Sequence, residues 1–138
     1  MGRRNSIVRI AIVLLMVLAA LPAMASTASA LYKKGQNAEI RQDYVAAYSY
    51  YLRAYNLKPE NLSYRIATLR TRFEAGAQLV DRGRQLRDQG KLTEALAEFQ
   101  KAATTDPSSL IAREEIRRTQ AMIEAAGKTQ TSDAIAPQ

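Results

Sequence analysis

The chain has 138 residues, 47% of them hydrophobic and 24% charged, which is enough apolar material for one small globular core. It contains no Cys and no His, so disulfides, thiolate nucleophiles and the commonest general base are all absent. This composition excludes hydrolases of the Ser/His/Asp or Cys/His kind and nearly excludes zinc sites. We therefore expect a non-enzymatic protein without a cofactor or a metal site.

The net charge of +7 is concentrated at the N-terminus, where Arg3, Arg4 and Arg9 have no acidic residue near them in the sequence. After residue 25 the chain has 17 basic and 13 acidic residues, a net charge of +4. An excess of this size suits contact with acidic proteins or lipids and is too small to indicate nucleic-acid binding.

Residues 1–25 have the pattern of a secretory signal peptide. A basic start precedes an apolar run, Ile10–Leu21, which is shorter than the roughly 20 residues that span a bilayer. Small residues at Ala23 and Ala25 predict cleavage after Ala25, and a second small-residue triplet offers cleavage after Ala30. An uncleaved anchor is the alternative. The pattern predicts an exported protein of the bacterial periplasm or the periplasmic face of the outer membrane.

The remaining chain is predicted to be all-helical, because Pro and Gly are scarce and no stretch alternates with a period of two. It also repeats itself, since residues 43–59 align with residues 91–107 at an offset of 48. The matched pairs are Gly35 with Gly83, Ala47 with Ala95, Tyr51 with Phe99, Ala54 with Ala102, and Pro59 with Pro107.

These positions resemble the 34-residue tetratricopeptide repeat. Copies over 26–61 and 76–109 match the family's signature at Leu31, Gly35, Ala38, Tyr44, Ala47, Tyr51, Ala54 and Pro59, and at Leu79, Gly83, Leu86, Leu92, Ala95, Phe99, Ala102 and Pro107. Leu replaces the family's usual Trp in both copies. The resemblance implies an all-α fold of helical hairpins, a short α-solenoid, in which Gly35 faces Ala47 and Gly83 faces Ala95.

The offset of 48 exceeds one repeat by 14 residues, which form a helical extension over 62–75. Its apolar residues Leu62, Ile66, Leu69 and Phe73 recur with the period of a helix. Because 14 residues turn through nearly four full turns, we predict one continuous helix from Leu62 to Asp88, roughly 40 Å long. Asn61 is the predicted N-cap of this helix.

The C-terminal part is predicted to be a capping helix over 110–126, preceded by an N-cap at Ser108 or Ser109 and ended by Gly127. Residues 127–138 have the composition of a disordered tail.

The tetratricopeptide resemblance implies a partner-binding groove lined by the first helix of each repeat. The matching residues are Tyr32, Gln36, Glu39, Ile40, Val80, Arg84, Arg87 and Asp88. All seven Tyr residues lie between Tyr32 and Tyr64, and we expect Tyr44 and Tyr51 to be core residues rather than a peptide-binding surface.

Six arginines occur in the predicted long helix: Arg65, Arg70, Arg72, Arg82, Arg84 and Arg87. Acidic residues interrupt the run, so we expect a solvated helix face, with docking on anionic lipid as the alternative.

A further resemblance is to the N-terminal, repeat-bearing region of bacterial secretins, the channels of type II secretion and type IV pilus systems. It depends on Leu31–Glu39, Tyr44–Tyr48, Leu57–Pro59 and Gly83–Leu92. It implies a protein-binding scaffold, stand-alone or truncated, whose partners are outer-membrane secretion or pilus components. A general periplasmic adaptor for cell-wall or outer-membrane maintenance is the alternative.

Overall fold

The computed structural model describes residues 27–135, and side chains as far as residue 128. Every regular element in this range is a helix, so the all-α prediction is confirmed for it. Residues 27–40 are helical, and α2 (Tyr44–Leu57), α3 (Leu62–Asp88), α4 (Leu92–Thr105) and α5 (Leu110–Ile135) follow in order. The predicted signal peptide lies outside the described residues.

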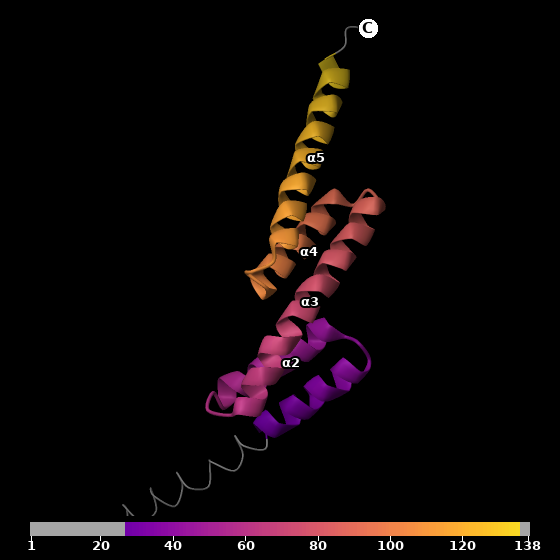
Figure 1. Ribbon diagram of the computed structural model, residues 1–138. Coiled ribbons are helices and arrows are strands. Elements are labelled where there is room, and N and C mark those ends of the chain that lie inside the picture. Colours follow the sequence, from indigo (N-terminus) through magenta and orange to yellow (C-terminus); the bar gives the residue numbers. More distant parts are fainter. Residues whose placement is uncertain (1–26, 136–138) are drawn as a thin grey trace, which may run out of the picture.

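The helices form two antiparallel hairpins, and the long helix of the second hairpin also packs on the first (Figure 1). Helix 27–40 and α2 form the first hairpin, and α3 and α4 form the second. Helix α3 packs against α2 with its first half and against α4 with its second half. Helix α5 packs on α4 and then projects beyond the turn between α3 and α4.

The prediction of one helix from Leu62 to Asp88 is confirmed at both ends. The helix begins where the Asn61 side chain accepts a hydrogen bond from the backbone N–H of Tyr64 at 3.1 Å, which satisfies one of the first unpaired amides. It ends before Gly90, whose φ of 78° lies in the left-handed region that glycine adopts without a steric penalty.

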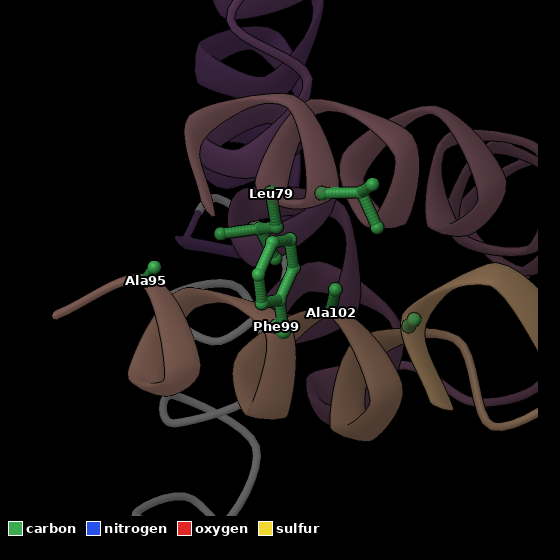
Figure 2. Packing of buried hydrophobic residues seen from close by; sticks show 6 residues of the cluster. Leu79, Ala95, Phe99 and Ala102 are labelled. Carbon is green, nitrogen blue, oxygen red and sulfur yellow. The ribbon is translucent and has the colours of Figure 1, made fainter. Parts of the chain in front are cut away.

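Each hairpin is held together by a glycine that lies against an aromatic ring. A Cβ added to Gly35 would come within 2.5 Å of the Tyr51 ring, and one added to Gly83 within 2.5 Å of the Phe99 ring. The atoms nearest to each glycine therefore belong to an aromatic ring, for which the missing side chain makes room, and the facing of Ala47 and Ala95 stays a prediction. Figure 2 shows Phe99 pointing from α4 toward α3, beside Leu79.

The correspondence at an offset of 48 continues into the helix that follows each hairpin. Asn61 caps α3 and Ser109 caps α5, as predicted for both helices. In each case the side-chain oxygen accepts a hydrogen bond from the backbone N–H three residues later. Thr71 and Thr119 are both fully buried, and each hydroxyl donates to the carbonyl four residues earlier, at 2.7 Å. The first half of α3 therefore covers the first hairpin as α5 covers the second.

Helix α3 buries different faces in its two halves. Its first half packs Tyr64, Ala67 and Thr71 on the first hairpin, and its second half packs Leu79 and Val80 on α4 and α5. The apolar row that predicted this helix is exposed: Leu62 by 65%, Ile66 by 54%, Leu69 by 45% and Phe73 by 52%. The small residues Ala67 and Thr71 occupy the core instead, because they allow close approach between helices.

The predicted end of the last helix at Gly127 is wrong, because α5 continues through that residue to Ile135. Gly127 does not have the positive φ of a C-capping residue, and no proline follows it before Pro137. Residues 127–135 of the predicted disordered tail are thus helical, and residues 136–138 lie outside the described part of the chain.

Candidate functional site

Two of the first four predicted groove residues, Tyr32 and Glu39, lie in a contact between helix 27–40 and α3. The ring of Tyr32 lies 4.9 Å from that of Tyr64 and 5.2 Å from that of Tyr51. The Glu39 carboxylate accepts hydrogen bonds from the Tyr51 hydroxyl, at 2.8 Å, and from the Arg70 guanidinium. Arg70 holds the pKa of Glu39 below its ordinary value, whereas burial and the bond to Glu39 raise the pKa of Tyr51.

Three of the last four, Val80, Arg84 and Arg87, lie in the equivalent contact between α3 and α5. Val80 is buried with Ala112, and the Arg84 Nε donates to Glu115 Oε1 at 2.7 Å. Arg87 donates to the other oxygen of the same carboxylate and lies over the Phe99 ring, 5.6 Å from its centroid. Burial of Glu115 favours its neutral form, but the bonds from Arg87 and Arg84 outweigh that effect and lower its pKa.

The eight predicted groove residues therefore do not form one groove. Tyr32 and Val80 belong to separate hydrophobic clusters, and the polar members between them serve as helix-to-helix contacts. Gln36, Ile40 and Asp88 are exposed, and Ile40 is 80% exposed on its own near the end of helix 27–40.

The structure instead presents an uncovered apolar surface on the first half of α3. We define the α3 face as Leu62, Ile66, Leu69 and Phe73, which follow one another at helical spacing and are all about half exposed. A row of large apolar side chains in water is unfavourable for an isolated protein, so the α3 face is a candidate binding surface. The periodicity of the sequence identified these residues, but as the stripe of a packed helix.

Two hollows border the α3 face. One of about 360 Å³ lies between α2 and α3, and its lining includes Tyr48, Leu52, Tyr55, Arg65 and Leu69. The other, of about 250 Å³, lies where Phe73 approaches Ile111 at the start of α5. The row is thus an irregular surface with depressions on two sides, into which side chains of a partner can insert.

Two arginines, Arg65 and Arg72, border the α3 face. Arg65 is exposed and makes no ion pair within the described residues. Arg72 lies over the Phe73 ring, 4.7 Å from its centroid, and its Nε is buried without a hydrogen-bond partner, 3.8 Å from Asp106. The predicted solvated arginine face is therefore divided. Arg70, Arg82, Arg84 and Arg87 form ion pairs with other elements, Arg72 forms a long ion pair with Asp106, and Arg65 forms none within the described residues.

Within residues 27–128, no group of three or more His, Cys, Asp or Glu side chains is arranged to hold a metal ion. None of the described helices combines the length and the apolar character needed to cross a bilayer. The α3 face and the arginines beside it offer apolar contact and positive charge.

No family model, no curated protein and no solved structure matches this chain significantly.

Proposed function

We propose that this protein is a non-enzymatic helical scaffold that binds another protein through the α3 face. The observation that carries the proposal is a comparison within the chain. The positions of α5 equivalent to Leu62, Ile66, Leu69 and Phe73, 48 residues onward, are Leu110, Glu114, Arg117 and Ala121. The α5 face thus has charged residues at its two middle positions, whereas the α3 face has apolar side chains at all four, which supports a partner that covers the α3 face.

We further propose that the two hairpins are tetratricopeptide-type repeats separated by an insertion. The glycine-to-ring contacts and the matching caps support this reading. In a tandem array the second hairpin would follow the first directly. Here 14 extra residues displace it by about 21 Å along α3, at 1.5 Å per residue. The displacement explains why α4 leaves the first half of α3 uncovered.

We place the protein in the bacterial envelope, within a secretin-type secretion or pilus assembly. The signal-peptide pattern and the secretin-like segments support this assignment. Cleavage after Ala25 would retain Ala28, which is fully buried against the first hairpin together with Leu31 and Ala54. A general periplasmic adaptor is the alternative, and it would use the same surface.

The proposal is tested by fractionating the native host's envelope on a non-denaturing gel. We expect the wild-type protein to migrate with a large complex and the Ile66→Ser/Leu69→Ser variant to migrate as a small species. The Ile40→Ser/Leu110→Ser variant is the matched control, because it also removes two exposed apolar side chains but leaves the α3 face intact. It should migrate like the wild type.

A small wild-type species would contradict the proposed assembly. Unchanged migration of the Ile66→Ser/Leu69→Ser variant would show that another surface binds the partner. Circular dichroism and thermal unfolding of both variants control for folding, and because all four side chains are at least 45% exposed we expect little change in stability.

A further inference from the structure

The chain itself shows what kind of element covers this side of α3. Val80 lies seven residues after Phe73, two helical turns further along the same row. Val80 is 4% exposed, because Ala112 and Ile116 of α5 pack in the same cluster. Where this row is covered within the chain, the element that covers it is therefore another helix.

Each covering contact also pairs an arginine with a glutamate across the two helices. Where α5 covers α3, the Glu115 carboxylate forms ion pairs with Arg84 and Arg87. Where α3 covers helix 27–40, Arg70 meets Glu39. Apolar contact along the helices and a charge-assisted bond at the edge thus occur together in both places.

At the α3 face, Arg65 has no carboxylate partner within the described residues, and Arg72 has only Asp106, 3.8 Å from its Nε and without a hydrogen bond to that atom. Arg65 and Arg72 lie seven residues apart, two turns or about 10.5 Å along the helix, and both line the hollow between α2 and α3. Helix α2 contributes no acidic residue to this hollow, since its sequence from Tyr44 to Leu57 contains none. The edge of the α3 face therefore complements negative charge.

A second copy of the chain does not meet this requirement. Antiparallel two-fold pairing of two α3 faces would bring Arg65 and Arg72 of one copy toward the same residues of the other, and like charges across an interface are unfavourable.

Building on the function proposed above, we infer that the segment bound by the α3 face is an amphipathic helix of a partner protein. Its apolar side chains pack on Ile66, Leu69 and Phe73, and side chains enter the hollow beside Leu52. Acidic residues two turns apart on one edge pair with Arg65 and Arg72.

Binding of three synthetic helical peptides, measured by fluorescence anisotropy at low salt, tests this inference. The peptides have about 20 residues and share one leucine row. They differ in two residues that lie seven apart on one edge, which are both Glu, both Gln or both Lys. We expect the Glu peptide to bind most tightly and the Lys peptide most weakly. The Glu preference should decrease as salt is added.

The Arg65→Glu variant should lose about fivefold in affinity for the Glu peptide and gain affinity for the Lys peptide. Arg113→Glu is the matched control, because Arg113 occupies the equivalent exposed position on α5 and should leave all three affinities unchanged. Ile66→Ser/Leu69→Ser should weaken binding of all three peptides.

Equal binding of the three peptides, or no binding, would overturn the inference. So would binding to vesicles of phosphatidylglycerol and phosphatidylcholine that depends on Ile66 and Leu69, because the occupant would then be a membrane. Self-association that Ile66→Ser/Leu69→Ser abolishes in sedimentation would assign the face to a second copy.

Failure of this inference is distinguishable from failure of the proposed function. If Arg65→Glu leaves the envelope complex intact and Ile66→Ser/Leu69→Ser removes it, the scaffold function stands and the acidic helix is rejected. If neither variant affects the complex, both proposals are rejected.

Discussion

At the scale of single residues, the hairpins depend on two glycines that make room for aromatic rings. Phe99 is fully buried against Gly83, and Tyr51, which is 1% exposed, lies against Gly35. Because interiors are close-packed, even one methyl group at either glycine must displace the ring or the facing helix.

We predict that Gly83→Ala lowers the free energy of unfolding by about 2 kcal/mol or more, as measured by urea denaturation. Gly127→Ala is the control, since a Cβ there meets nothing within 4 Å and alanine is the better helix former. It should raise stability by up to about 1 kcal/mol. If Gly83→Ala were as stable as the wild type, the close glycine-to-ring contact would be refuted.

Residue patterns predicted much of this packing, because glycine, alanine and proline constrain the backbone locally. The cap at Asn61 and the burial of Tyr51 follow from such patterns. Tyr44 is half-buried rather than fully enclosed. Gln42 adopts a φ of 58° at the position equivalent to Gly90, which no local pattern predicts because the hairpin turn imposes it.

At the scale of helices, periodicity predicted the bounds of α3 but not its buried face. A repeating apolar row shows that a segment is helical and amphipathic, but it does not show which neighbour covers it. In α3 the Leu62-to-Phe73 row faces water and the row with Ala67 and Thr71 faces the core. Comparison with Glu114 and Arg117, the equivalents of Ile66 and Leu69, could have revealed this from sequence.

The placement of the predicted groove residues has a related cause. The resemblance assigned all of them to one open surface, whereas in the structure the following helix covers some of them and leaves others exposed. Tyr32 is covered by α3, and Val80 by α5. Long-range pairs such as Glu115 with Arg87 depend on how helices stack, which local sequence does not determine.

The contact between α3 and α5 leads to a prediction about acid stability. Glu115 is 7% exposed and its pKa lies below the ordinary value of 4.5, because Arg87 and Arg84 bond to the charged form against the effect of burial. A carboxylate with a depressed pKa in the folded state stabilises the fold above its unfolded pKa and loses that contribution as the pH falls through its folded pKa.

We therefore expect thermal stability to decrease as the pH falls below about 4.5, and we expect this decrease to be smaller in Glu115→Gln. At neutral pH that variant should be about 2 kcal/mol less stable, because two guanidinium groups lose their charged partner. Glu114→Gln is the control: its surface pair with Arg117 is exposed and should contribute little. Parallel pH profiles for wild type and Glu115→Gln would contradict the assignment.

At the scale of the whole molecule, the long helix α3 connects the two hairpins, because it contacts both α2 and α4. Each hairpin contacts its neighbours through α3, so stability is transmitted along the row of helices rather than through one central core. The first half of this helix packs on the first hairpin with one face and leaves its Leu62-to-Phe73 row exposed. The extra 14 residues thus convert a packing surface into a candidate binding surface.

The most direct test of the central claim, that the α3 face is bare in the isolated protein and covered by a partner in the envelope, is thiol labelling. The chain has no Cys, so single-cysteine variants report one position each. Leu69→Cys samples the α3 face, Leu110→Cys an exposed site on α5, and Leu79→Cys the core.

We predict that purified Leu69→Cys and Leu110→Cys react at similar rates and that Leu79→Cys is protected. In the native envelope, Leu69→Cys should become protected while Leu110→Cys stays reactive. If Leu69→Cys reacts as fast in the envelope as in the purified protein, no partner covers the α3 face and the account is wrong.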